Sequence, residues 1–289
     1  MLITYDEATK LIRSGKLLHL AGSESLLKKL PCGNWIGGST EYFLVEDGYE
    51  VAANLVFITE LKYKDFTVIA YTTNEIKNVA TDAYKNGFSI IIVPGNSSVH
   101  KEYTRCMASR SMTGLYKKSS KNISGWVAGI HNETSTQPPI VINGITKEIY
   151  TDKAVALHLQ NPVSKEASVD ITNIFEQDKS TAVIEFPDEG FSINKCFVDG
   201  KEVVFADYID QNNIDIMLPL VGDYSGNSVN ISFKTIENGT VNFYAPVFPG
   251  VKYHMAKSIC DYEKEFNKRL SKHKNENTAF SATAYSIYC

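Results

Sequence analysis

The feature that most constrains the fold is the nearly uninterrupted apolar run Ser89–Val93 (SIIIV) in the first half of the chain. A strand that is apolar at successive positions is covered on both faces, as in sheets flanked by other layers. Before it, Asn74–Asn86 has apolar residues at helical spacing, and after it we expect a helix over residues 99–108. The order of these elements predicts a β-α-β unit and an α/β first half.

The rest of this half mixes short helices and strands. We expect helices over Tyr5–Ser14 and Ser23–Leu30, strands over Lys16–Gly22, Trp126–His131 and Ala154–Gln160, and a Gly-rich loop over Pro31–Gly38. Two β-rich runs, Val51–Glu60 and Phe66–Thr72, flank the polar stretch Lys62–Asp65, which predicts a hairpin turn. Asn143-Gly144 predicts a second hairpin between Ile140–Ile142 and Ile145–Tyr150, because Asn-Gly is a strong two-residue turn signal.

Beyond Pro162 the pattern changes to short alternating runs separated by turn dipeptides such as Asp199-Gly200 and Asn238-Gly239. This spacing predicts antiparallel strands. We expect an α/β half over residues 1–160, a mainly antiparallel half over 161–270 with a terminal helix at Asp261–Leu270, and a mobile polar tail over 271–289. The predicted fold class is α/β or α+β, with the β-α-β half packed against the antiparallel half.

Composition excludes several functional classes. The 289 residues are 43% hydrophobic and 21% charged, which is typical of a globular protein. A net charge of −4 gives no electrostatic footprint for nucleic acid or an acidic membrane. No apolar run reaches the length of a membrane span or a signal peptide, so we expect a cytoplasmic protein without nucleic-acid or membrane partners.

Neither a metal nor a cofactor is expected. The five cysteines are scattered without a Cys-x-x-Cys pair, which favours reduced thiols. The six histidines have no metal-ligand spacing, and His158, inside an apolar strand, is expected to be a hydrogen-bonded core residue.

Two resemblances bear on function. The segments Leu30–Gly38 (LPCGNWIGG), Leu218–Gly226 (LPLVGDYSG) and Tyr244–Tyr253 (YAPVFPGVKY) together resemble an uncharacterised bacterial family of unknown function, over about residues 5–265. The stretch from Gly125 to Leu159 is similar to the middle of FIST (F-box and intracellular signal transduction) domains. The second resemblance implies a sensory protein that binds a small ligand such as an amino acid, but it implies no particular binding residues.

Four loops carry glycine, aromatic and hydroxyl residues after predicted strands, where α/β proteins place their sites. Paired glycines allow close approach of a ligand to the backbone, and a tryptophan provides a flat apolar wall. We therefore predict a site for a small polar ligand in a protein that can also be an oligomer. The predicted ligand-binding residues are Trp35, Gly37, Gly38, Thr40, Tyr42, Asn96, Ser97, Ser98, Trp126, Gly129, Asp223 and Tyr224.

Each part of this set also has a purely structural interpretation. Paired glycines serve turns, and Trp35 can anchor a core. The serines at Ser97 and Ser98 can cap the helix that follows, and Asp223 can accept backbone N–H bonds in a turn.

Two other functions stay open. Gly95–Val99 (GNSSV) approaches the nucleophile elbow G-x-S-x-G, with Val99 where the elbow needs a small residue. A serine hydrolase would use Ser97 or Ser98 with Asp223 and His254 as partners, which requires a histidine ring beside the hydroxyl. A structural or interaction subunit would instead expose a large apolar patch.

Overall fold

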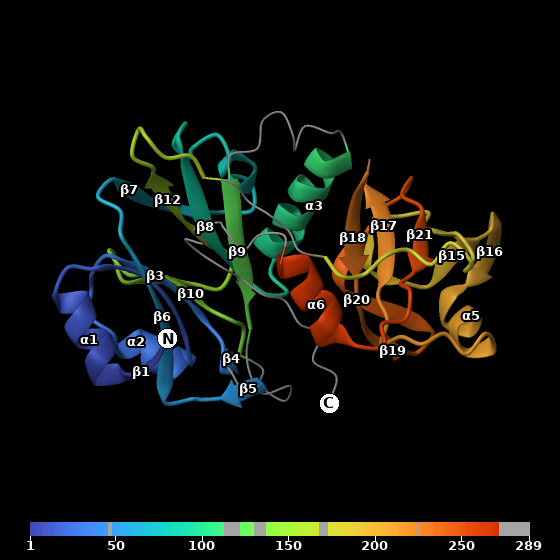
Figure 1. The fold of residues 1–289 in the computed structure, drawn as a ribbon, viewed down its shortest axis with the longest axis horizontal. Helices are drawn as coiled ribbons and strands as arrows, with labels where there is room; N and C mark the ends of the chain where they lie inside the picture. Colours follow the sequence, from blue (N-terminus) through green and yellow to red (C-terminus); the bar gives the residue numbers. More distant parts are fainter. Residues whose placement is uncertain (46–47, 113–121, 130–136, 168–172, 225, 272–289) are drawn as a thin grey trace. The chain divides into compact units, whose positions relative to one another are not determined.

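The computed structural model describes residues 1–45, 48–112, 122–129, 137–167, 173–224 and 226–271. The chain divides into two compact units. Unit 1 consists mainly of Met1–Cys106 and Ser119–Val169, and unit 2 mainly of Met107–Lys118 and Asp170–Asn277. In Figure 1, unit 1 carries the blue and green strands and unit 2 the orange and red ones.

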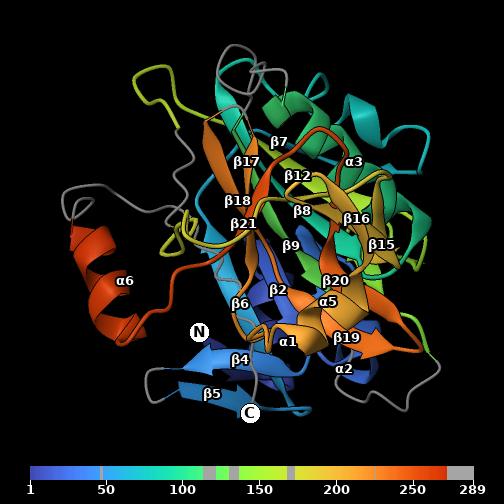
Figure 2. The same ribbon diagram turned by 90° about the vertical axis from the view of Figure 1, so that its right-hand side faces the viewer.

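Unit 1 contains two sheets. The larger runs in the order β1 (Leu2–Thr4), β6 (Leu55–Leu61), β2 (Leu17–Gly22), β3 (Trp35–Ser39), β10 (Val141–Asn143) and β11 (Glu148–Tyr150). The smaller runs in the order β7 (Phe66–Tyr71), β12 (Ala154–Gln160), β8 (Gly87–Pro94) and β9 (Asn122–Ala128). The pairs β2–β3 and β8–β9 are parallel and the other pairs are antiparallel. Figure 2 shows β4 (Tyr42–Val45) and β5 (Gly48–Val51) as a separate hairpin.

Helices cover the outer faces of both sheets. Helices α1 (Tyr5–Arg13) and α2 (Glu24–Lys29) pack on the larger sheet, while the short 3-10 helix η1 (Ile76–Asn78) and α3 (Ser98–Met112) lie on the smaller one. The side chains of β8 alternate between the two layers that cover it. Ile90 and Ile92 belong to the cluster between the sheets, whereas Ile91 and Val93 belong to the outer cluster beneath η1 and α3. The prediction of a strand covered on both faces is confirmed, and α3 is the crossover between the parallel strands β8 and β9.

The predicted helix over Asn74–Asn86 is wrong. Only η1 is helical there, although Ile76, Val79 and Ala80 are buried as their spacing predicted. The Asn78 carbonyl accepts the N–H groups of Thr81 and Asp82 at 2.8 and 3.0 Å and also the Thr81 hydroxyl at 2.8 Å, so the chain continues beyond η1 in turns. Polar residues of this kind favour turns over helix interiors.

Two other local predictions are also corrected. Strands β6 and β7 belong to different sheets, so Lys62–Asp65 is a connection between layers and not a hairpin turn. The Gly-rich stretch becomes strand β3 from Trp35 onward. The second hairpin is confirmed, but with the longer turn 144–147, since Asn143 pairs with Glu148. The strand predicted at Trp126–His131 is β9, which ends at Ala128; His131 lies outside the described residues.

The indole rings of Trp35 and Trp126 lie on opposite faces of strand β3, which itself begins at Trp35. A Cβ at Gly37 would lie 3.1 Å from Cζ3 of Trp35, and one at Gly38 would lie 2.6 Å from Cγ2 of Ile92 and 3.0 Å from Cη2 of Trp126. Gly144, after β10, faces the Trp35 ring even more closely. The glycines of β3 and of the following hairpin therefore provide space for the two indole rings.

Unit 2 is antiparallel in every pairing of its described strands, as predicted. One sheet runs in the order β16 (Lys201–Val204), β15 (Lys195–Val198), β13 (Ile184–Glu185), β21 (Tyr253–Met255), β17 (Leu220–Tyr224) and β18 (Asn227–Ile231). The other runs β14 (Gly190–Ile193), β20 (Thr240–Val247) and β19 (Phe233–Glu237). Helix α5 (Phe205–Gln211) was not predicted, whereas α6 (Tyr262–Leu270) was. The observed fold class is mixed α/β, as predicted.

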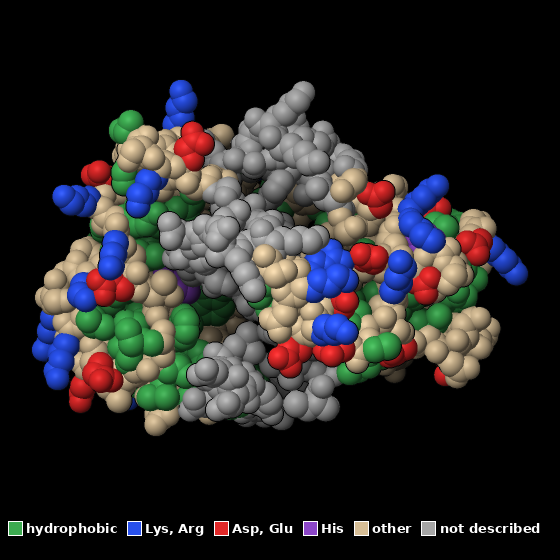
Figure 3. All heavy atoms as spheres, viewed as in Figure 1, with side chains coloured by type: hydrophobic (Ala, Val, Ile, Leu, Met, Phe, Trp, Pro, Cys, Tyr) green, Lys and Arg blue, Asp and Glu red, His purple; other side chains and the backbone are tan. Residues whose placement is uncertain are grey.

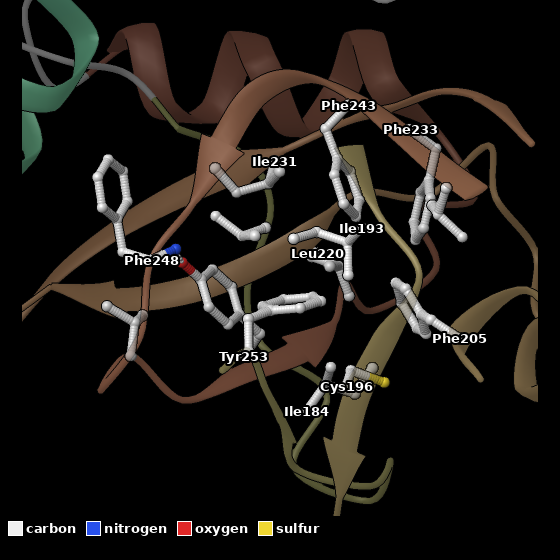
Figure 4. Close-up of a cluster of buried hydrophobic side chains, with 14 of the residues drawn as sticks. Ile184, Ile193, Cys196, Phe205, Leu220, Ile231, Phe233, Phe243, Phe248 and Tyr253 are labelled. Atoms are coloured by element: carbon white, nitrogen blue, oxygen red, sulfur yellow. Dashed lines mark hydrogen bonds between the residues drawn. The ribbon is translucent and has the colours of Figure 1, made fainter. Parts of the chain in front are cut away.

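An aromatic core holds unit 2 together (Figure 4). Phe186, Phe205 and Phe243 meet edge-to-face or tilted, with ring centroids 5.6–6.3 Å apart. The buried Tyr253 hydroxyl accepts the Phe248 N–H at 3.0 Å. Burial also raises the pKa of the Cys196 thiol to about 12, so this thiol is an apolar packing group.

We predict that Gly38→Ala lowers the free energy of unfolding by about 2 kcal/mol, because the new methyl group overlaps Ile92 and the Trp126 ring. Gly129→Ala is the matched control, since a Cβ there meets no atom of the described residues within 4 Å. Urea denaturation of both variants measures the difference. Equal stabilities would contradict the close packing on β3.

Candidate functional site

Three of the four predicted loops lie at one end of unit 1, where β3, β8 and β9 finish. They carry the predicted residues Thr40 and Tyr42, Asn96 to Ser98, and Gly129. The Gly129 N–H donates to the Ser39 carbonyl at 2.8 Å, and the buried Ser39 hydroxyl donates to the Gly129 carbonyl at 2.8 Å. The Gly95 N–H donates to the Ala128 carbonyl at 3.0 Å. These bonds fix the loops that follow the three strands beside one another.

Trp126 is half-buried at this end. Its indole N–H donates to Nε2 of His19 at 2.7 Å, and the two rings meet edge-on at 6.0 Å. His19 lies on β2 and Trp126 on β9, so this bond joins the two sheets of unit 1. Burial lowers the pKa of His19 to about 4, and the accepting Nε2 requires the same neutral form.

Apolar side chains continue from Trp126 across the larger sheet. Leu2, Leu55, Phe57 and Trp126 are half-buried and pack around Ala21, Phe43 and Ala52; we call these four side chains the Trp126 strip. Phe57 stacks on Phe43, with centroids 6.4 Å apart. Figure 3 shows apolar side chains reaching the surface around β1 and β6. The strip is therefore an apolar surface that the protein only partly covers.

Polar groups border the strip. The Thr40 N–H donates to the Gly22 carbonyl at 2.9 Å, and the Thr40 hydroxyl accepts the Tyr42 N–H at 3.2 Å. Tyr42 is 43% exposed and pairs with Val51 in the β4–β5 hairpin. A Cβ at Gly129 would have no atom of the described residues within 4 Å.

Trp35 and Gly37 lie elsewhere than expected. Trp35 is fully buried on the opposite face of β3, among the residues that pack against α1 and α2, and its indole N–H donates to the Pro31 carbonyl at 2.9 Å. The structure thus gives both residues the core role that was the alternative interpretation.

Asn96 lies in the turn before α3, Ser97 directly precedes the helix, and Ser98 is its first residue. The Ser97 hydroxyl donates to the Pro94 carbonyl at 2.6 Å and accepts the His100 N–H at 3.1 Å, which is a helix cap. Val99 packs in the cluster on the outer face of the smaller sheet, whereas Trp126 packs in the cluster between the sheets. The start of α3 and the Trp126 ring therefore lie on opposite faces of that sheet.

The remaining predicted residues lie in unit 2. Oδ1 of Asp223 accepts the Gly226 N–H at 2.7 Å, as in a turn. Tyr224 is buried and shares a hydrogen bond of 2.9 Å with the Tyr253 hydroxyl. Nδ1 of His254 donates to the Thr181 carbonyl at 3.0 Å. The hydrolase set Ser97, Asp223 and His254 is divided between the two units, and each of the three has a structural partner in its own unit.

A buried polar chain in unit 1 was only partly foreseen. The Ser89 hydroxyl lies 2.7 Å from Nδ1 of His158, Nε2 of His158 lies 2.9 Å from the Tyr71 hydroxyl, and that hydroxyl donates to Asp82 at 3.1 Å. Because the Tyr71 hydroxyl donates its proton to Asp82, it accepts the Nε2–H of His158. Nδ1 of His158 then carries no proton and accepts the Ser89 hydroxyl. Burial, aided by Asp82, raises the pKa of Tyr71. The prediction for His158 is confirmed.

One sequence signal could have found this chain. Ser89 is the one polar residue in the run Ser89–Val93, and His158 is the first polar residue of Ala154–Gln160. The two face each other in the β8–β12 register. All members except Asp82 are buried, so the chain ties the covering segment to the sheet.

Within the described part of the chain, no cluster of three or more His, Cys, Asp or Glu side chains is arranged to hold a metal ion. No described helix has the length and apolarity needed to span a membrane.

We predict that Tyr71→Phe lowers the free energy of unfolding by about 2 kcal/mol, because Nε2–H of His158 then has no acceptor at this position. Tyr63→Phe is the control and should cost under about 0.5 kcal/mol, since among the described residues the Tyr63 hydroxyl bonds to Asn161 alone, at a long 3.4 Å. Thermal unfolding of the two variants measures the contrast. Equal losses would contradict a tightly bonded buried chain.

We also predict that His19 makes stability depend on pH. Its folded pKa of about 4 lies below the ordinary 6.5, so the unfolded chain binds more protons between these values. The contribution of neutral His19 is therefore complete above pH 6.5, falls as the pH drops through this window, and is lost below pH 4. Compared with His19→Gln, the wild-type chain should lose about 3 kcal/mol between pH 7 and pH 4. A pH-independent difference between the two would refute this.

Comparison with known proteins gives the family but no activity. A family model described as a family of unknown function, DUF6976, matches residues 3–289. No curated protein and no solved structure matches the chain. The FIST resemblance has no support from these comparisons. The family match extends over nearly the whole sequence, and the chain therefore belongs to the DUF6976 family of unknown function.

Proposed function

We propose that unit 1 binds a small ligand whose flat or apolar part lies on the Trp126 strip and whose polar part meets the backbone and hydroxyl groups at Thr40 and Gly129. The observation that carries this proposal is the half-buried Trp126 ring, held by His19 at the end of the sandwich where three loops meet. A tryptophan fixed by a 2.7 Å hydrogen bond is a rigid wall.

The surroundings of the ring match the composition of ligand sites. Such sites are lined mainly by apolar and aromatic side chains and have a few polar groups that orient the ligand. Leu2, Leu55 and Phe57 supply partly exposed apolar surface, and Thr40 and Gly129 supply polar groups at its border.

Within this proposal the protein is a binding module. A sensory role additionally requires that the bound ligand change a surface that another molecule reads. The β4–β5 hairpin is suited to this, because Phe43 of β4 packs against Phe57 of the strip. The start of α3, on the other face of its sheet, is not needed by the proposal.

The chain has two tryptophans, so an ¹⁵N-labelled sample gives two indole N–H signals that single Trp→Phe variants assign. We predict that a member of a panel of common amino acids and nucleosides shifts the Trp126 signal and leaves the Trp35 signal in place, because Trp35 is fully buried. Trp126→Phe should weaken binding of that compound by about tenfold, in line with the loss of a tryptophan wall.

Trp35→Phe is the matched control and should bind the same compound with unchanged affinity. The proposed site would be contradicted if no compound of the panel shifts either indole signal, or if compounds shift the Trp35 signal alone.

A further inference from the structure

Strand β7 is an edge strand of unusual composition. It forms one end of the four-stranded sheet, pairs with β12 on one side, and pairs with no described strand on the other (Figure 1). Its six residues, Phe66–Tyr71 (FTVIAY), contain no charge, proline or glycine. Such a strand presents unpaired N–H and C=O groups and is a template for another strand.

Most other edge strands of the described chain carry a feature that opposes pairing. Natural sheets protect their edges by shortness, charge, bulges or covering groups. The edge strands β1 and β11 have only three residues each, and β16 and β19 carry Lys and Glu. The pairing of β14 and of β19 with β20 contains a register shift. In β18 the Ser228 carbonyl accepts a hydrogen bond from the Asn173 side chain. β9, at the other end of the β7 sheet, has Gly125 near its middle, which weakens a strand.

We propose that the free edge of β7 pairs antiparallel with β7 of a second copy of this chain, so that the two four-stranded sheets become one continuous sheet. An antiparallel pair of identical strands is self-complementary about a two-fold axis, as in most homodimers. When the two-fold axis is perpendicular to the sheet, the same face of each copy lies on the same side of the continuous sheet. Thr67, Ile69 and Tyr71 of both copies therefore lie on one face.

Charges at the ends of the strand are compatible with this pairing. With the axis at Val68, Asp65 lies opposite Tyr71 of the second copy and Lys64 opposite Thr72. With the axis at Ile69, the same two residues lie opposite Thr73 and Asn74. No like charges face each other in either register, whereas a strand with charged residues in its centre would repel its own copy.

Sedimentation velocity of the full chain over micromolar concentrations tests this inference. The wild-type protein should sediment as a dimer. Thr67→Lys should raise the dissociation constant at least tenfold, because the Thr67 side chain is exposed and a lysine on the edge opposes pairing. Val127→Lys is the matched control, since it adds the same charge at an exposed position of β9 and should leave the dimer intact.

Circular dichroism of the variants establishes that each is folded, and hydrogen exchange of wild-type amides locates the interface. Slow exchange over Phe66–Tyr71 in the wild type that becomes faster in Thr67→Lys supports pairing at β7. A wild-type monomer at all concentrations, or a dimer that Thr67→Lys leaves intact, would overturn the inference.

Discussion

Unit 1 depends on two consecutive positions of β3 that have no side chain. Gly37 leaves room for Trp35 on one face of the strand, and Gly38 leaves room for Trp126 and Ile92 on the other. Because Gly38 lets the Trp126 ring lie against the larger sheet, the indole N–H reaches His19 on the neighbouring strand. The packing of the two sheets and the shape of the candidate site thus have the same cause.

Polar side chains inside the sheets add specific links to this apolar packing. His19 joins the two sheets through Trp126, and His158 joins Ser89 and Tyr71 within one sheet and, through Tyr71, Asp82 of the covering segment. A buried donor or acceptor is costly to leave unsatisfied, so each link favours one arrangement of the layers over its alternatives. In unit 2 an aromatic cluster has the corresponding role, with Tyr253 bonded to Tyr224 and to the Phe248 backbone.

Elements with strong local signals could be predicted from the sequence. Helix α1 has a capping box between Thr4 and Glu7, and β12 is apolar at five of its seven positions. Strand β3 could not be predicted, because its glycines disfavour a strand locally and are explained only by contact with the distant Trp126 ring. The helix expected over Asn74–Asn86 failed because its apolar spacing was satisfied by turns.

Part of the candidate site could likewise be predicted from the sequence, and part could not. Trp126, Thr40, Tyr42 and Gly129 were foreseen as residues of loops that follow strands, and the structure places them at one end of unit 1. The rest of the strip comes from β1 and β6, whose side chains gain a role only through the order of the strands. Trp35 and Tyr224 have the residue types of a pocket but are packed in cores.

Native mass spectrometry of gently purified protein, followed by identification of any released molecule under denaturing conditions, tests the proposed binding role most directly. We predict one small molecule with a flat or apolar part per wild-type chain, and its loss in a folded Trp126→Ala variant. A wild-type protein that carries only its chain mass, or a molecule that stays bound to the folded variant, would contradict the proposal that the Trp126 strip is a ligand site.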